Sequence, residues 1–193
     1  MSIIRVHGRN LHYATAGQGP DLILLPGASS NMRLWHMYVA PLLRREFRVT
    51  TCDLRGYDAA PGDLLGVLDQ LDIPRAILAG HDVGASVCLS DAQAGPARVS
   101  RLILLDPDLA SLAHDVRNVS TPALLACARE SRFADSYDYL QARLPNCTPV
   151  WLPRGRRFGS LECPELLTEH ILNFLRADTF FSAPAPASRR LSA

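Results

Sequence analysis

The hydrophobic positions of the chain follow two kinds of spacing. Short apolar runs bounded by turn residues predict strands, and apolar residues three or four positions apart predict amphipathic helices. The strands are expected at residues 3–7, 11–14, 22–25, 47–52, 76–79, 102–105, 123–127 and 148–152. The helices are expected at residues 35–45, 64–71, 83–94, 109–116, 135–144 and 164–175. The first two strands flank Gly8-Arg9-Asn10, which is typical of a hairpin turn.

This alternation predicts the fold class. Runs such as residues 22–25 are apolar at every position, as expected for parallel strands that are covered on both faces. We therefore predict an α/β fold, with a mostly parallel sheet of about seven or eight strands and helices on both faces. A chain of 193 residues favours a single domain, placed at residues 1–182. Residues 183–193 are rich in Pro, Ala and Ser, and we expect them to form a disordered tail.

Composition excludes several classes of function. The formal net charge is +1, so no strong field draws the chain to nucleic acid or to an anionic membrane. No apolar run approaches the roughly 20 residues that a membrane helix needs, and the first residues lack the pattern of a secretory signal. The five cysteines are scattered without metal-ligand spacing, which indicates free thiols in a reducing compartment. We expect a cytoplasmic protein, with a small molecule as its partner and with neither metal nor cofactor.

Residues 76–85, AILAGHDVGA, carry the clearest chemical motif. An apolar strand runs into Gly80-His81-Asp82-Val83-Gly84, and a helix rich in small residues follows. This is the form of a nucleophile elbow, with Asp82 at the position where serine is more usual. Such a turn needs glycine where strand and helix pack closely, and it presents the central side chain at the carboxyl end of the sheet. We expect the Asp82 oxygen to be open to a small molecule there.

The sequence as a whole resembles the α/β-hydrolases. The resemblance extends to about Phe174 and rests on five stretches in the order that the family has them. These are LILLPGASSNMRLW, TCDLRGYD, LAGHDVGAS, RLILLDP and FGSLECPELLTEHILNFL. The GHDVG turn in particular is similar to that of epoxide hydrolases and dehalogenases, which attack their substrates with an aspartate.

The resemblance implies a two-step hydrolysis. A carboxylate is ionised at neutral pH and attacks an sp³ carbon without a base, which leaves an ester on the enzyme. A histidine, held by a second acid, then activates the water that hydrolyses this ester. The alternative is that Asp82 is only a helix N-cap, which typically stabilises a helix by roughly 1 kcal/mol. Both roles can coexist in one residue.

The chain departs from the family at the histidine. The position that matches it is Arg157, in RGRRFGSLECPE, and an arginine cannot take a proton from water. The other histidines have ordinary explanations on the surface or in the core. His81 is expected to pack under the turn, because neighbouring side chains point apart. His36 follows the loop after residues 22–25 and is the first that we would test.

The sequence offers alternatives for the second acid and for the loop that would supply oxyanion donors. The family's usual acid position falls near Glu130-Ser131, whereas Asp106 matches the position used by some relatives. Asp106 is either this acid or a turn residue before Pro107, and an arginine at 157 would pair with Asp106 or Asp108. Backbone N–H groups of Ala28 and Val83 are candidate oxyanion donors. The alternative for the Pro26-Gly27-Ala28-Ser29 loop, where Ser29 would face the substrate, is a plain turn.

Two functions therefore remain open. The first is a hydrolase that uses Asp82 on a small electrophile, an epoxide or an ester-like molecule. The second is a catalytically degenerate relative that binds a ligand or a partner. Residues 109–121 are too few for the helical lid of epoxide hydrolases, which predicts an open site and an exposed surface that favours a homodimer.

Overall fold

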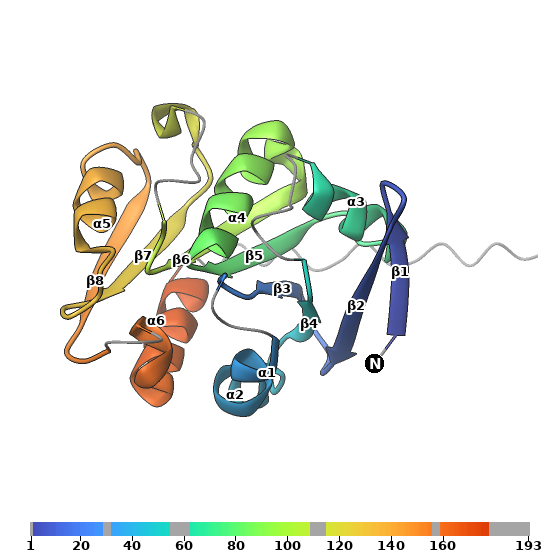
Figure 1. Cartoon of the computed structure of the whole chain (residues 1–193), viewed down its shortest axis with the longest axis horizontal. Coiled ribbons are helices and arrows are strands. Elements are labelled where there is room, and N and C mark those ends of the chain that lie inside the picture. Colours follow the sequence, from blue (N-terminus) through green and yellow to red (C-terminus); the bar gives the residue numbers. More distant parts are fainter. Residues whose placement is uncertain (1, 29–31, 55–61, 109–114, 156–158, 178–193) are drawn as a thin grey trace, which may run out of the picture.

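An eight-stranded sheet forms the centre of the protein (Figure 1). The computed structural model describes residues 2–28, 32–54, 62–108, 115–155 and 159–177. The strand order is β1-β2-β4-β3-β5-β6-β7-β8. β1 pairs antiparallel with β2, and β2 pairs antiparallel with β4, whereas every other pairing is parallel. The strands are β1 Ser2–Val6, β2 Arg9–Ala16, β3 Asp21–Leu25, β4 Arg48–Cys52, β5 Ala76–His81, β6 Val99–Leu105, β7 Ala123–Ala128 and β8 Cys147–Leu152.

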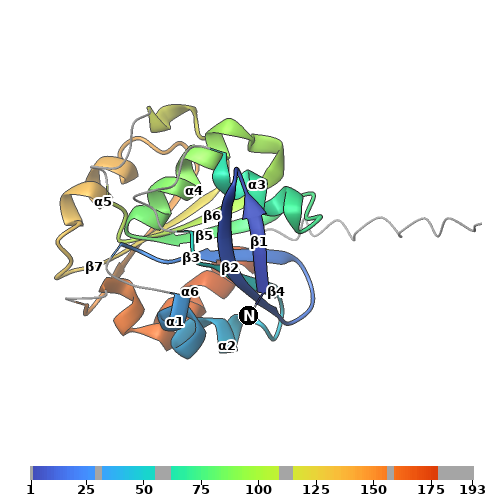
Figure 2. The ribbon, with the colours of Figure 1, turned by 45° about the vertical axis from the view of Figure 1, so that its right-hand side comes forward.

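Helices cover both faces of this sheet, which confirms the predicted fold class (Figures 1 and 2). One layer holds α3, α4 and α5, and the other holds α1, α2 and α6. Their bounds are α1 Met32–Leu34, α2 Ala40–Leu43, α3 Asp63–Gln70, α4 Val83–Ala94, α5 Ala134–Gln141 and α6 Pro164–Arg176. No helix in these described stretches combines the length and the apolar character that crossing a membrane requires.

The continuous apolar runs are explained by two separate cores. Ile23 and Leu25 of β3 pack under α3 and α4, while Leu22 and Leu24 pack against α2 and α6. All four side chains are fully buried. Since successive side chains of a strand point to opposite faces, a strand between two helical layers needs an apolar residue at every position.

The first helical segment departs from the expectation of one regular helix over residues 35–45. It is divided into α1, a stretch of π-helix at Trp35–Val39, and α2. The indole of Trp35 is fully buried and donates a 3.0 Å hydrogen bond to the carbonyl of Leu25, at the end of β3. The wider turn is thus tied to the carboxyl end of the central strand.

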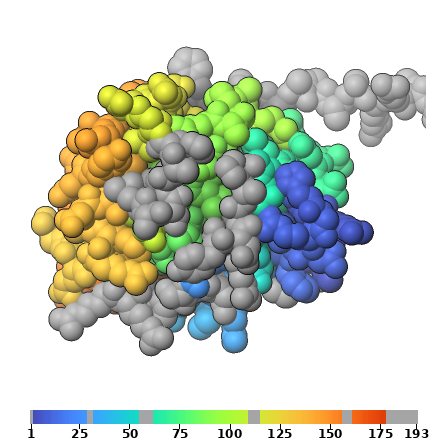
Figure 3. Space-filling model, turned by 45° about the horizontal axis from the view of Figure 1, so that its top comes forward, coloured from blue at the N-terminus to red at the C-terminus, as the bar shows by residue number. Residues whose placement is uncertain are grey.

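Residues 109–114 of the helix expected at 109–116 lie outside the described residues, and in the described stretch that follows, Val116–Asn118 forms a short 3-10 turn. The expected tail, 183–193, lies outside them as well. The space-filling view places the N-terminal hairpin (blue) and the yellow and orange part of the chain that includes α5 on opposite sides of α4 (Figure 3).

Candidate active site

The turn from β5 into α4 has a strained backbone that its glycines permit. Asp82 has φ 57° and ψ −124°, a conformation that costs energy for a residue with a side chain. A Cβ on Gly80 would lie 2.2 Å from the carbonyl oxygen of Gly84, and a Cβ on Gly84 would lie 2.6 Å from that of Pro26. Neither distance is compatible with a side chain. Both glycines are therefore required for strand, helix and the loop after β3 to meet here.

The carboxylate of Asp82 does not cap the helix that follows it. Asp82 stands directly before α4, yet its side chain bonds none of the N–H groups in the first turn, all of which are described. Its Oδ2 instead accepts a 3.2 Å hydrogen bond from the backbone N–H of Ala28. The N-cap role is thereby excluded, and one of the two expected donors, Ala28, is in contact with the aspartate.

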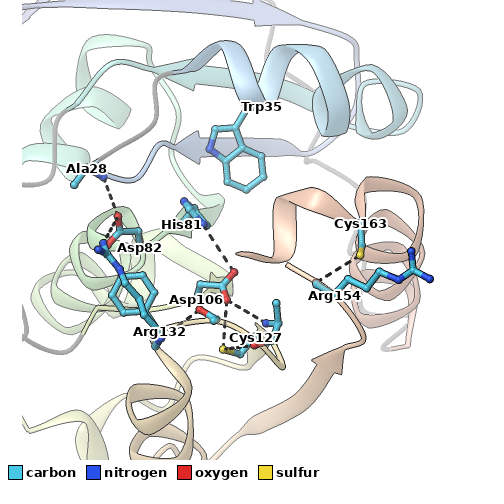
Figure 4. Close-up of polar contacts among 12 residues, drawn as sticks. Ala28, Trp35, His81, Asp82, Asp106, Cys127, Arg132, Arg154 and Cys163 are labelled. Atoms are coloured by element: carbon cyan, nitrogen blue, oxygen red, sulfur yellow. Dashed lines mark hydrogen bonds and ion pairs between the residues drawn. The ribbon is translucent and has the colours of Figure 1, made fainter. Parts of the chain in front are cut away.

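The two oxygens of Asp82 have different surroundings. Oδ2 lies against Ala28 and 3.9 Å from a guanidinium nitrogen of Arg132, whereas Oδ1 has no hydrogen-bond partner among the described residues. The side chain is 2 % exposed, so the expectation of an open carboxylate is wrong. Ala28, in the loop after β3, and Arg132, in the chain after β7, both lie against this carboxylate (Figure 4).

Burial also sets the protonation of this aspartate. Loss of water around the carboxylate raises the pKa of Asp82, and Asp108 acts in the same direction. His81, the N–H of Ala28 and Arg132 oppose this effect on the pKa without cancelling it. The site therefore holds a carboxylate that is harder to ionise than an ordinary aspartate.

Asp106 follows β6, the strand beside β5, and is 1 % exposed. Its Oδ1 accepts hydrogen bonds from the N–H of Ala128, at 3.1 Å, and from the thiol of Cys127, at 3.3 Å. Its Oδ2 lies 3.9 Å from Nε2 of His81 (Figure 4). Burial and the nearby carboxylate together raise the pKa of the Cys127 thiol far above its usual range, so the sulfur is not a nucleophile.

His81 is buried, as expected, but its ring lies beside Asp82 rather than away from it. A Cβ on Gly27 would lie 2.7 Å from Nδ1 of His81 and 3.0 Å from Oδ2 of Asp82. The imidazole and the carboxylate thus flank the same point in space, where glycine leaves room for both. The inference that adjacent side chains point apart is wrong here, because both side chains reach the point where a Cβ on Gly27 would lie.

The remaining predicted residues are distributed as follows. His36 is exposed, and its Nε2 lies 2.7 Å from Oγ1 of Thr51 on β4, so the structure does not bring it to Asp82. Val83 begins α4 with a fully buried side chain. Ser29 and Arg157 lie outside the described residues, and so does any pairing of Arg157 with an aspartate.

Sequence reasoning missed Arg132. This residue follows β7, one position after the Glu130-Ser131 pair considered for the acid. Its side chain is 70 % exposed, and its guanidinium stacks over the ring of Phe133 at 4.6 Å and approaches Asp82. The predicted topology could have indicated Arg132, because the carboxyl ends of neighbouring parallel strands converge on one edge of the sheet.

The described residues contain no cluster of three or more His, Cys, Asp or Glu side chains arranged to hold a metal ion. The five cysteines all lie in described stretches and are free thiols; Cys52, Cys88 and Cys127 are buried, and the other two are half-buried. What converges on the sheet edge is a carboxylate, a backbone donor, an imidazole with its own carboxylate, and a guanidinium.

Comparison with known proteins shows the family of the chain. The model of the Alpha/beta hydrolase family matches residues 22–192. Epoxide hydrolase 2 of Siraitia grosvenorii is 34 % identical over 116 residues, which are 53 % of this chain and 37 % of that protein. An epoxide hydrolase of Caballeronia sordidicola is 27 % identical over 162 residues, 77 % of this chain and 47 % of that protein. The chain thus spans less than half the length of either relative.

Solved structures support the same fold. The meta-cleavage product hydrolase of Pseudomonas fluorescens IP01 superposes with a TM-score of 0.83 at 15 % sequence identity, covering 92 % of this chain and 98 % of that one. At this identity the likeness concerns the fold alone. Together with the family match over most of the sequence, it establishes that the chain belongs to the alpha/beta hydrolase family.

Proposed function

We propose that the protein is a hydrolase that attacks a small electrophilic substrate, an epoxide or an ester-like molecule, with Oδ1 of Asp82. The proposal rests on the different surroundings of the two oxygens of the Asp82 carboxylate. Oδ2 is held by Ala28, and Oδ1 lacks a hydrogen-bond partner among the described residues. A buried acceptor without a partner is unfavourable, which is typical of a group kept for a ligand. The relatives named epoxide hydrolase support the choice of substrate class.

The first step forms an ester on the enzyme. An electron pair of Oδ1 attacks the less hindered carbon of an epoxide, the C–O bond of the ring breaks, and the resulting alkoxide takes a proton from water. The guanidinium of Arg132, 3.9 Å from Oδ2, is placed to stabilise the negative charge that develops on the departing oxygen.

The second step removes the ester. In this ester Oδ2 is the carbonyl oxygen. When water attacks Cγ of Asp82, Oδ2 becomes an oxyanion. The N–H of Ala28 already points at this atom, and the N–H of Val83 is the adjacent candidate at the start of α4. Collapse of the intermediate releases the diol and restores the carboxylate. Backbone donors of this kind typically contribute about 3 kcal/mol to the barrier reduction.

The contact with Arg132 does not prevent this chemistry. A separation of 3.9 Å is too long for a hydrogen bond, and the Arg132 side chain is 70 % exposed, so water can hydrate the guanidinium when it leaves the carboxylate. A substrate can therefore replace the guanidinium at the carboxylate without a large penalty.

The test is a covalent adduct on Asp82. We expect incubation with a panel of small epoxides and haloacids to add the mass of the alkyl group to the intact protein. Peptide mass spectrometry should locate the adduct on Asp82, and Asp82→Asn should show none. Asn is a suitable control because it tolerates the positive φ at this position and keeps the shape of the side chain. Absence of both adduct and hydrolysis product with the whole panel would refute the proposal.

Two features favour a second function. Asp82 is buried, and the position that matches the family's histidine holds Arg157, so a relative that only binds a ligand remains the alternative. This function predicts saturable binding of a small molecule, measured calorimetrically, with no adduct and no turnover of activated esters. Asp82→Asn would then change affinity alone.

Formation of the adduct should depend on pH with a displaced midpoint. Only ionised Asp82 attacks, and burial raises the pKa of Asp82 above the ordinary value of 3.8. The rate should therefore be lost as the pH falls through this raised pKa, and half of the maximal rate should be reached above pH 3.8. The rate of adduct formation, followed by mass spectrometry across the acid range, measures it. A midpoint at or below 3.8 would contradict the dominant role of desolvation.

A further inference from the structure

The hydrolytic step needs a base, and the family's position for one is occupied by Arg157. Three of the other histidines lie elsewhere. His7 of the N-terminal hairpin bonds Asp63 at 2.7 Å, His36 bonds Thr51, and His170 lies within α6. His81 is different, since it is buried on the same strand end as Asp82 and faces a second buried carboxylate. His81 and this second carboxylate, Asp106, are therefore candidates for the role of the missing base.

We propose that His81 is the general base for hydrolysis of the Asp82 ester, with Asp106 as its positioning residue. This inference rests on the proposed function, because it needs the ester to form. The inference is based on the positions of the two ring nitrogens of His81, one near each carboxylate. Nε2 lies 3.9 Å from Oδ2 of Asp106, and Nδ1 lies at Gly27, beside Oδ2 of Asp82.

Each carboxylate has a separate role in this arrangement. Asp106 is fixed by the N–H of Ala128 and the thiol of Cys127 on one oxygen, which leaves the other directed at the imidazole. At 3.9 Å the carboxylate of Asp106 acts on Nε2 through its charge and not through a hydrogen bond, and water screens this charge little because both side chains are buried. The charge favours the tautomer with the proton on Nε2 and stabilises the imidazolium once it forms. Nδ1 is then the basic nitrogen, and it is the nitrogen on the side of Asp82.

The step balances without another reagent. Nδ1 takes a proton from a water molecule as the water oxygen bonds to Cγ of the ester and the electron pair of the carbonyl moves to Oδ2. The tetrahedral intermediate then expels the alkoxide, which takes the proton back from Nδ1 and leaves as the alcohol. The imidazole is neutral again, and Asp82 is released as a carboxylic acid, which loses the remaining proton to water and becomes the carboxylate. The lack of a side chain at Gly27 is essential, since a Cβ would occupy the space beside both groups.

The charged groups that face this pair are known. Asp82 and Asp106 flank the imidazole from β5 and the end of β6, and Arg132 and Asp108 act on Asp82 from the chain after β7 and after β6. Two carboxylates near the ring favour its protonated form. Asp106→Asn should therefore move the midpoint of ester hydrolysis to lower pH, a change that a merely structural residue would not produce.

The test separates formation of the ester from its removal. Single-turnover reactions with a small epoxide are followed by intact-protein mass spectrometry in wild type, His81→Gln, His81→Asn and Asp106→Asn. We expect the two His81 variants to form the adduct within about threefold of the wild-type rate and to clear it at least about 100-fold more slowly. The matched control is His12→Gln, an exposed histidine of the hairpin, which should behave as wild type.

The outcomes are distinguishable. An adduct in wild type that clears, but persists in the His81 variants, supports the inference. Clearance at the wild-type rate in either folded His81 variant overturns it and leaves the proposed function intact. An adduct that never clears in wild type also overturns it, and leaves only the first step of the proposed function. Absence of any adduct and of any turnover, in wild type and in both His81 variants, instead refutes the proposed function. If glutamine is not tolerated, His81→Asn and the pH profile of Asp106→Asn carry the test.

Discussion

Replacing Gly80 by alanine should destabilise the protein by about 3 kcal/mol or more, or prevent folding. The added Cβ would lie 2.2 Å from the carbonyl oxygen of Gly84, 2.3 Å from its carbonyl carbon and 2.5 Å from the backbone nitrogen of Ala85. These are backbone atoms in the first turn of α4, which cannot move without moving the helix. Chemical denaturation followed by circular dichroism measures the loss of unfolding free energy.

Gly8→Ala provides the matched control. Gly8 has φ +84°, and a Cβ there would meet no atom within 4 Å. This variant should lose only about 1 kcal/mol, the cost of a left-handed conformation. Equal losses in the two variants would show that crowding at the turn is not what requires Gly80.

Replacing Asp91 by alanine should have the second large effect, a loss of about 3 kcal/mol. Asp91 lies on α4 and is fully buried, and its Oδ2 accepts hydrogen bonds from the N–H groups of Leu64, at 2.8 Å, and Leu65, at 3.2 Å. Its Oδ1 accepts from the N–H of Gly62. The carboxylate thus caps α3 from a neighbouring helix, and its removal leaves these donors without a protein acceptor.

Asp69→Ala serves as the comparison for Asp91. Asp69 lies on α3 with 62 % of its side chain exposed and forms an ion pair with Arg98 at 2.7 Å. An exposed pair typically contributes less than about 1 kcal/mol, so thermal unfolding should barely change. A loss at Asp91 no larger than that at Asp69 would show that water replaces the buried cap.

The fold was predictable because hydrophobic spacing and topology agree. The strand through residues 76–79 extends to His81 in the structure, and α4 has the expected bounds, Val83–Ala94, because Gly95-Pro96 ends it. The π-helix at Trp35–Val39 could not be predicted, since its apolar spacing is close to that of an α-helix. The hydrogen bond of Trp35 to the end of β3 is a tertiary contact that no local pattern encodes.

The candidate site was predictable only in part. The glycines of the turn and the contact with the loop after β3 follow from the motif, because strand, turn and helix leave few arrangements. The burial of Asp82, the approach of Arg132 and the orientation of His81 depend on side chains contributed by three separate strand ends. Sequence spacing reports which strand ends meet, and it does not report which rotamers the side chains adopt there.

The hydrogen bond from Trp35 to the carbonyl of Leu25 makes the fluorescence of Trp35 an intrinsic probe of the site. The indole is buried and hydrogen-bonded to Leu25, which lies three residues before Ala28. The N–H of Ala28 donates a hydrogen bond to Asp82. The other tryptophan, Trp151, packs against Tyr137 under the opposite helical layer. The fluorescence of Trp35 is therefore sensitive to the loop, whereas that of Trp151 forms a background, and events at the carboxylate become visible without a label.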